Sequence, residues 1–133
     1  DVQIVKNLFK KNFTSSTSLY YIERLRKIKN RENYLISKAY IPVEIIGEIE
    51  SKKIFEDKNL LNVLIDKFQI KFSKSTQEIS SILLDKNEAK IFNTTINMPA
   101  ISNTWYFYDL HKKLVLIDKE ITLKPIKVIN NYY

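Results

Sequence analysis

Cysteine is absent from this chain of 133 residues, and glycine and histidine occur once each. Without cysteine there is no disulfide bond, no thiolate nucleophile and no metal centre built on thiolates. A single glycine, Gly47, argues against loops that cradle phosphates or dinucleotides, because these loops need several glycines. No apolar run approaches the ~18 residues of a membrane span, and no signal peptide is visible.

Residues in patterns that would support catalysis are also scarce in this sequence. The one histidine, His111, lies between Asp109 and the pair Lys112-Lys113, in a stretch that predicts an exposed turn. Neither a nucleophile elbow nor a pair of carboxylates at catalytic spacing is present. We therefore predict a protein that is not an enzyme and that binds no cofactor or metal; an enzyme without a recognisable motif is the third hypothesis for function.

Length and composition favour one α+β domain over residues 1–133. Hydrophobic residues make up 44% of the chain, which is enough for a packed core. We expect amphipathic helices in the basic segment 1–31, packed on a mostly antiparallel sheet in the core 34–133, with a β-meander at the C-terminus.

The N-terminal segment shows helical spacing of apolar residues. One predicted helix begins near Val2 and a second runs over 19–29, with Leu19, Ile22 and Leu25 facing inward. Most of the net charge of +7 lies in this segment, which contains eight basic residues and only two acidic ones. The basic face is either a solvated helix surface or a contact for anionic lipid or nucleic-acid phosphate. The candidate contacts are Lys6, Lys10, Lys11, Arg24, Arg26, Lys27, Lys29 and Arg31.

The middle of the chain predicts short alternating elements. Strands are expected over 34–41, 43–50 and 90–93. Asn59 has the position of a cap for a helix over 60–68. The sequence Ser75-Thr76-Gln77-Glu78 has the form of a capping box and predicts a further helix.

The clearest strand signal lies between Ser102 and Pro125. Trp105 and Phe107 alternate with Tyr106 and Tyr108, and a short polar turn leads into a second alternating run over 114–117. We expect a third strand after a turn at Asp118-Lys119, and we expect Trp105 to be buried in the core.

The stretch from Asn103 to Asp109, followed by Leu114 to Ile117, is similar to the C-terminal part of type IV pilin-like proteins and pseudopilins. Their globular domains often show a W-Y-x-x-D, turn, L-V pattern near the end. The resemblance implies a non-enzymatic subunit of a filament or pseudopilus in a cell envelope, and it carries over no binding residue.

Two hypotheses for function follow from these patterns. The first is a structural or interaction subunit of a larger assembly, most plausibly a pilus, secretion or conjugation apparatus. Its partners would be other protein subunits and an anionic membrane surface. The periplasmic side of the envelope is the favoured location, and the cytoplasm is the alternative. The alternative is a basic protein associated with nucleic acid, such as a ribonucleoprotein component, in which residues 1–31 contact phosphate.

Overall fold

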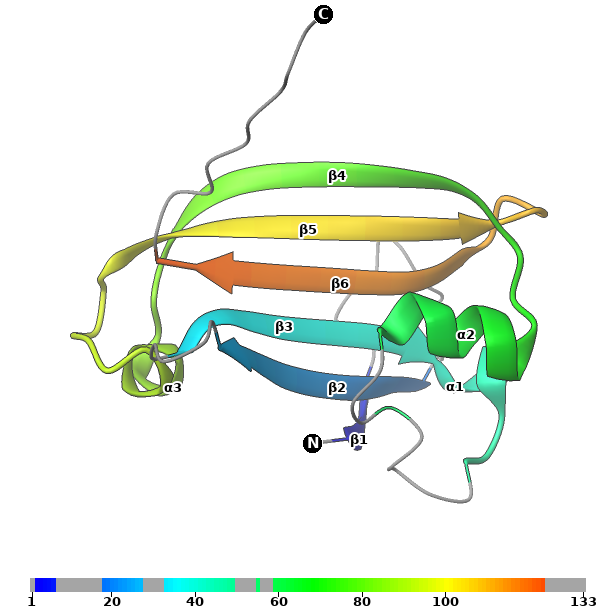
Figure 1. Cartoon of the computed structure of the whole chain (residues 1–133), viewed down its shortest axis with the longest axis horizontal. Coiled ribbons are helices and arrows are strands. Elements are labelled where there is room, and N and C mark those ends of the chain that lie inside the picture. Colours follow the sequence, from blue (N-terminus) through cyan, green and yellow to red (C-terminus); the bar gives the residue numbers. More distant parts are fainter. Residues whose placement is uncertain (1, 7–17, 28–32, 50–54, 56–58, 124–133) are drawn as a thin grey trace, which may run out of the picture.

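A computed structural model describes residues 2–6, 18–27, 33–49, 55 and 59–123 of the chain. Six strands form one sheet in the order β1-β2-β3-β6-β5-β4, and each neighbouring pair is antiparallel (Figure 1). The strands are β1 (Val2–Lys6), β2 (Ser18–Lys27), β3 (Asn33–Pro42), β4 (Phe72–Leu83), β5 (Pro99–Asp109) and β6 (Leu114–Thr122). The helices are α1 (Val43–Ile46), α2 (Leu60–Phe68) and α3 (Lys86–Ile91).

The prediction of amphipathic helices in residues 1–31 was wrong, and with it the predicted fold of N-terminal helices packed on a sheet. The described parts of that segment are the strands β1 and β2, which pair with each other. The spacing of Leu19 and Ile22 fits either structure, but a helix would also bury Leu25, whose side chain is 46% exposed. In β2, Tyr20 and Ile22 instead share one buried face with a spacing of two residues.

Several local predictions were confirmed. The strand over 34–41 is β3, and the helix over 60–68 is α2. The Asn59 side chain caps α2 by accepting a hydrogen bond from the backbone N–H of Leu61 at 2.9 Å. The Trp105 strand and its successor form the hairpin β5–β6. The prediction of a third strand in the meander was wrong, because β6 continues without a turn through Asp118 and Lys119 to Thr122.

Three other local predictions were wrong. Residues 43–46 form the single turn α1, which ends at Gly47 with a φ of +66° that favours glycine. Ser75 to Glu78 belong to β4, and the capping box lies ten residues later between Asp85 and Glu88, at the start of α3. Residues 90 and 91, predicted as strand, end α3.

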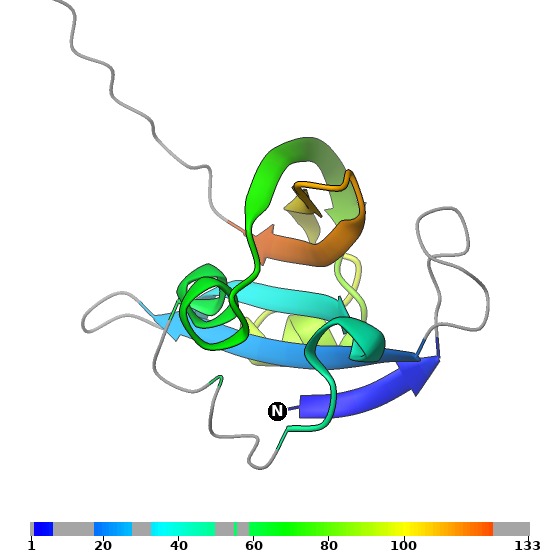
Figure 2. The ribbon, with the colours of Figure 1, turned by 90° about the vertical axis from the view of Figure 1, so that its right-hand side faces the viewer.

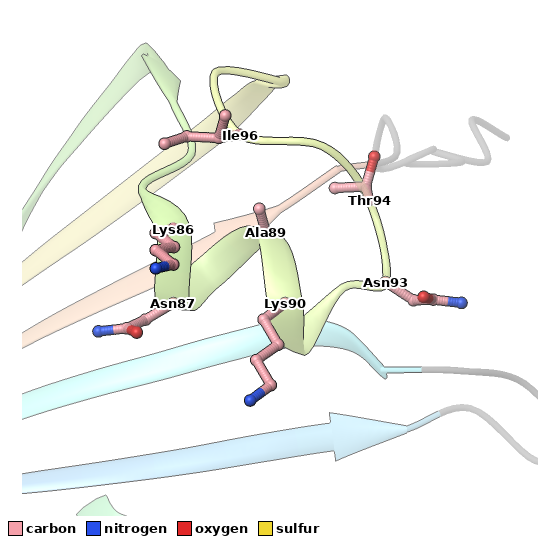
Figure 3. A pocket seen from close by; sticks show the side chains of 7 residues that line it. All are labelled: Lys86, Asn87, Ala89, Lys90, Asn93, Thr94 and Ile96. Carbon is pink, nitrogen blue, oxygen red and sulfur yellow. The ribbon is translucent and has the colours of Figure 1, made fainter.

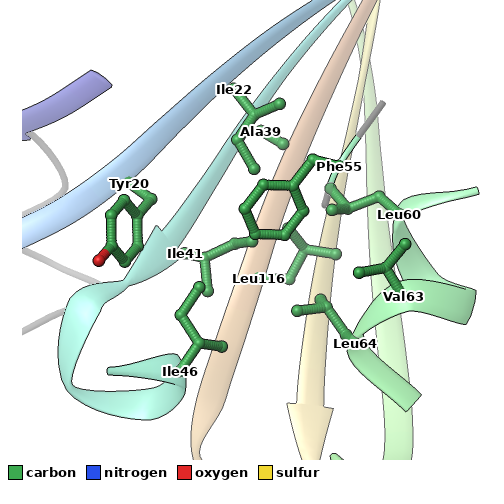
Figure 4. Close-up of a cluster of buried hydrophobic side chains, with 10 residues drawn as sticks. All are labelled: Tyr20, Ile22, Ala39, Ile41, Ile46, Phe55, Leu60, Val63, Leu64 and Leu116. Carbon is green, nitrogen blue, oxygen red and sulfur yellow. The ribbon is translucent and has the colours of Figure 1, made fainter. Parts of the chain in front are cut away.

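The sheet has two covered faces. We call the pocket face the one that carries Ile22, Ala39 and Leu116, and the rear face the one that carries Ile36 and Ile121. On the pocket face these residues pack against α1, α2 and Phe55, and Figure 4 shows the Phe55 ring at the centre of that cluster. Figure 2 shows that the sheet is strongly curved, so that β4 and β6 rise away from the level of β2 and β3.

On the rear face, α3 covers the end of the sheet that is opposite to the end covered by α1 and α2. Ala89 and Phe92 pack against Ile36, Ala100 and Ile121. On the pocket face, α1 and α2 cover one end of the sheet, and the candidate site lies beside the start of α2.

Candidate functional site

A pocket of about 420 Å³ lies on the pocket face between the start of α2 and the strands β2, β5 and β6. We call it the sheet pocket. Strand register assembles it, because Trp105 is paired with Asp118 and Asn103 with Glu120. The residues that line it are Arg24, Arg26, Asn59, Leu60, Leu61, Asn103, Trp105, Phe107, Leu116, Asp118 and Glu120.

The central strand β3 explains why this part of the sheet is hollow. In the middle of β3, between β2 and β6, the residues on the pocket face are the small Ser37 and Ala39, and both are fully buried. The larger Leu35 and Ile41 lie on the same face towards the two ends of the strand. Small side chains on the middle strand leave space that the longer side chains of the flanking strands surround. The Ser37 hydroxyl also donates a 2.7 Å hydrogen bond to Asp118 Oδ1 and so fixes that carboxylate in the pocket wall.

Four ionisable side chains face one another in the sheet pocket. Burial raises the pKa of Asp118, although the Ser37 hydrogen bond and the charges of Arg24 and Arg26 act in the opposite direction. Burial and then the Asp118 charge raise the pKa of Glu120. Burial lowers the pKa of the Arg24 guanidinium, although the Asp118 charge opposes this. In each case the loss of water around the group outweighs its pairing with opposite charge.

An aromatic wall completes the pocket. The rings of Trp105 and Phe107 are stacked with centroids 6.1 Å apart, and Phe72 meets Phe107 edge-on at 5.7 Å. Trp105 was predicted to be largely buried. Its side chain is partly buried in the wall of this pocket and belongs to neither cluster of buried core residues. Flat aromatic surfaces next to polar groups suit ligands that combine a ring with hydrogen-bonding substituents.

Two of the eight predicted basic contacts, Arg24 and Arg26, line this pocket. They do so because alternate residues of β2 face the same way, which is a strand property. Lys6 and Lys27 lie in β1 and β2, but the structure does not describe their side chains. The other four predicted contacts lie outside the described residues, and they are Lys10, Lys11, Lys29 and Arg31.

Sequence reasoning missed the acidic half of the pocket, Asp118 and Glu120. These residues were predicted to form a turn and a further strand, whereas they continue the alternation of Leu116 along β6. That alternation, in phase with Trp105 and Phe107 across the hairpin, was the available signal. His111 is exposed in the turn between β5 and β6, as predicted.

A second hollow, of about 500 Å³, lies beside α3 and the loop that follows it. Its lining includes Lys86 and Lys90, and Figure 3 shows that the side chains spread apart around the helix. One short helix and its loop supply every lining residue, whereas four elements converge on the sheet pocket. We call this second site the α3 hollow and regard the sheet pocket as the better candidate.

The described part of the chain contains neither a cluster of metal-binding side chains nor a membrane-spanning helix. In that part of the chain, no group of three or more histidine, aspartate or glutamate side chains is arranged to hold a metal ion. No helix there is both long and apolar enough to cross a membrane.

Comparison with known proteins identifies the family. The model of the UTRA domain family matches residues 10–122. The chain belongs to the UTRA domain family. UTRA domains are effector-binding regulatory domains of transcription factors. No curated protein matches the chain.

Solved structures agree on the fold. The effector-binding domain of the trehalose repressor of Bacillus subtilis has a TM-score of 0.76 at 12% identity, with 100% of this chain and 96% of that chain covered. The ligand-binding domain of a GntR-family transcriptional regulator from Bordetella bronchiseptica has a TM-score of 0.81 at 9% identity, with 100% and 86% covered. YydK of Bacillus subtilis, a possible transcriptional regulator, has a TM-score of 0.78 at 14% identity; the match covers 98% of this chain but 59% of YydK.

These findings overturn the resemblance to pilin-like proteins. The W-Y-x-x-D and L-V pattern belongs to a β-hairpin of a UTRA domain, and a hairpin of this kind is a local feature that unrelated folds share. The hypotheses of an envelope subunit and of a ribonucleoprotein component, with the protein and membrane partners expected for them, are corrected by the same family match.

Proposed function

We propose that this chain is the effector-binding domain of a transcriptional regulator and that the sheet pocket holds the effector. The observation that carries the proposal is the convergence of two guanidinium groups, two carboxylates and two carboxamides on a pocket of about 420 Å³ with an aromatic wall. Small-molecule sites are concave, of about 300–1,000 Å³, and combine apolar walls with a few placed polar groups. The family and the two structural neighbours described as effector-binding or ligand-binding domains support this role.

The pocket's chemistry suggests the class of effector. Trp105 and Phe107 provide a flat surface for one face of a ring, and Asp118 and Glu120 can accept hydrogen bonds from hydroxyl or amino groups on its edge. Arg26 is exposed and can bind a carboxylate or phosphate in a bidentate manner. We therefore propose a polar ring compound of about monosaccharide size that bears hydroxyl or amino groups and one acidic group.

The regulator role also leads us to propose where DNA is bound, where the protein works and how the chain is divided into domains. We propose that DNA is bound by another part of the regulator, in line with the 59% of YydK that the match covers. A protein that responds to an effector at DNA works in the cytoplasm and needs no catalysis. We further propose that residues 1–133 form one domain, since the N-terminal strands β1 and β2 share a single sheet with β3 to β6.

A ligand screen followed by calorimetry tests the proposal. Thermal unfolding would be recorded against sugars, amino sugars, sugar phosphates, amino acids and hydroxy acids, because a ligand at a hundredfold excess over its Kd stabilises the folded state by about 2.7 kcal/mol. Hits would then be titrated into the parent protein and into Arg26→Gln. We expect Arg26→Gln to weaken binding by about tenfold or more, since a charge-assisted hydrogen bond contributes about 1.5–3 kcal/mol.

The matched control is Lys90→Gln, which removes a cation from the α3 hollow. It should leave the affinity unchanged. A hit whose affinity falls in Lys90→Gln but not in Arg26→Gln would place the effector in the α3 hollow and contradict the proposal.

A further inference from the structure

The Asn103 carboxamide, in the wall of the sheet pocket, is held by a residue of the neighbouring strand β4. Gln77 donates a 2.7 Å hydrogen bond from its Nε2 to Asn103 Oδ1. Gln77 is paired with Trp105 across β4 and β5, so it lies on the same face of the sheet as Asn103. It is exposed and does not line the pocket itself, so it can act on the pocket through Asn103.

This hydrogen bond decides which end of the Asn103 carboxamide is directed to the pocket. A carboxamide carries an acceptor oxygen and a donor NH2 group on opposite sides of its carbon atom. Because the oxygen is directed to Gln77 on β4, the NH2 group is directed away from β4, towards β6. The β6 residue paired with Asn103 is Glu120, which also lines the pocket. A donor and an acceptor therefore stand side by side, whereas the reverse orientation would bring two acceptors together.

The second carboxamide of the pocket is oriented by the backbone. The Asn59 oxygen accepts hydrogen bonds from the backbone N–H groups of Leu61 at 2.9 Å and Asn62 at 3.4 Å. Since a backbone N–H can only donate, the NH2 group of Asn59 is the end that remains for a ligand. Both carboxamides thus serve as donors, and the acceptor side chains in the pocket lining are Asp118 and Glu120.

We infer, on the basis of the proposed function of the sheet pocket, that Gln77 is a positioning residue that makes the pocket select a hydroxyl group of the effector at Asn103 and Glu120. A hydroxyl can accept from the Asn103 NH2 group and donate to the Glu120 carboxylate at the same time. A protonated amino group can only donate, and an ether or keto oxygen can only accept. Each of these would leave one protein group unpaired, which is a main source of discrimination between similar ligands.

Gln77→Glu tests this orientation, because an ionised glutamate has nearly the same shape as glutamine but can only accept. To keep a hydrogen bond with the new carboxylate, the Asn103 carboxamide must turn over, so that its oxygen is directed to the pocket beside Glu120. Two neighbouring acceptors suit a protonated amino group. Gln77 is exposed, so the thermal midpoint should change little while the preference changes from hydroxyl to amino.

The probes are hexoses, hexuronic acids and hexose phosphates, each with counterparts in which one ring hydroxyl is replaced by hydrogen or by an amino group. They would be titrated calorimetrically at pH 7, where an amino group of this kind is mostly protonated. Only series whose affinity falls in Arg26→Gln are compared, because that loss places them in the sheet pocket. We expect the parent to bind the hydroxyl compound about tenfold more tightly than either counterpart. Gln77→Glu should bind the amino counterpart most tightly.

Two control variants separate orientation from charge. Ser75→Glu adds the same charge on the same strand and face, at an exposed residue paired with Phe107, and should keep the hydroxyl preference of the parent. Gln77→Lys retains a donor for the Asn103 oxygen and should keep that preference as well.

NMR tests the orientation without any ligand. In the parent, NOE cross-peaks from the Asn103 side-chain NH2 protons should reach the Glu120 side chain, and in Gln77→Glu they should reach the side chain at position 77. Parent cross-peaks to Gln77 in place of Glu120 would overturn the inference.

Two binding results would also overturn it while leaving the proposed function intact. They are a hydroxyl preference that Gln77→Glu does not change, and a change of preference that Ser75→Glu reproduces. Binding of every probe that is insensitive to Arg26→Gln would instead contradict the proposed function.

Discussion

Ser37 and Lys38 are neighbours on β3, and their side chains enter two different electrostatic environments on opposite faces of the sheet. On the rear face, Lys38 forms a 2.7 Å ion pair with Glu88 of α3, with side-chain exposures of 19% and 8%. On the pocket face, Ser37 supports Asp118, which shares the sheet pocket with Glu120, Arg24 and Arg26. One group of charges is closed beneath a helix, and the other borders an open pocket.

The pKa shifts favour the charged form of Lys38 on the rear face and the neutral forms of Asp118, Glu120 and Arg24 on the pocket face. The hydrogen bond and charge of Glu88 raise the pKa of Lys38 although burial, the largest single effect, acts against it. On the pocket face burial prevails over pairing, so Asp118 and Glu120 have raised pKa values and Arg24 a lowered one. Groups whose charged form is disfavoured by burial gain from a ligand that brings new hydrogen bonds to that form. The comparison supports a structural role for the Lys38–Glu88 pair and is consistent with the proposed binding role of the pocket charges.

The largest expected effect comes from breaking the rear pair. Glu88→Ala leaves Lys38 buried without its carboxylate and removes the capping box of α3, so we expect a loss of about 3–5 kcal/mol in the free energy of unfolding. The control is Glu44→Ala, which breaks the exposed 3.1 Å pair with Lys113 and should cost at most about 1 kcal/mol. Urea denaturation measures both, and equal losses would remove the distinction between closed and open charges.

A smaller effect on stability is expected at Trp105. Its side chain is half-buried at the pocket, whereas Leu64 is fully buried in the core beside Phe55. Leu64→Ala should cost about 2–5 kcal/mol and spare the effector site, while Trp105→Ala should cost about 1–2 kcal/mol and weaken effector binding. Thermal unfolding with and without a ligand hit separates the two. A Trp105→Ala protein as unstable as Leu64→Ala would return Trp105 to the core.

The pocket carboxylates predict a pH dependence of stability. The folded-state pKa of Asp118 lies above its ordinary value of 3.8, so the folded protein holds that proton more tightly than the unfolded chain does. The resulting stabilisation is complete below pH 3.8 and is lost as the pH rises through the raised pKa. In Asp118→Asn this loss should disappear, so that the unfolding free energy of the variant relative to the parent increases between acidic and neutral pH. A difference that stays constant over that range would mean that Asp118 titrates normally.

The smallest effect is expected at His111. Its side chain is exposed in the β5–β6 turn and lies outside the sheet pocket. His111→Ala should keep the affinity for a ligand hit within about threefold, because the substitution removes no side chain that lines the sheet pocket. A larger loss in calorimetry would extend the functional site to the hairpin turn.

Local signals in the sequence predicted the elements whose causes are local. The cap at Asn59 and the turn after Asp109 depend on a few adjacent residues, and α2 and the β5–β6 hairpin were predicted correctly. Residues 18–27 were not, because Leu19 and Ile22 fit a helix as well as a strand. The strand is decided by the pairing of β2 with β3, in which Ile22 lies opposite Ala39, 17 positions later, and Leu19 lies opposite Pro42, 23 positions later.

The site was harder to predict because its residues are far apart in the chain. Arg24 was singled out for its charge alone, and its neighbours Asp118 and Trp105 are brought to it by the strand order β2-β3-β6-β5. The hollow depends on small residues at Ser37 and Ala39, which no motif marks. Convergence of this kind is a property of the register and not of any single stretch of sequence.

The most direct test of the central claim is a crystal structure of the chain with the tightest ligand from the screen. We expect the ring of the ligand to lie against Trp105 and Phe107, with its polar groups in hydrogen-bond contact with Asp118, Glu120 or Arg26. A ligand bound in the α3 hollow beside Lys86 and Lys90, with the sheet pocket empty, would contradict it.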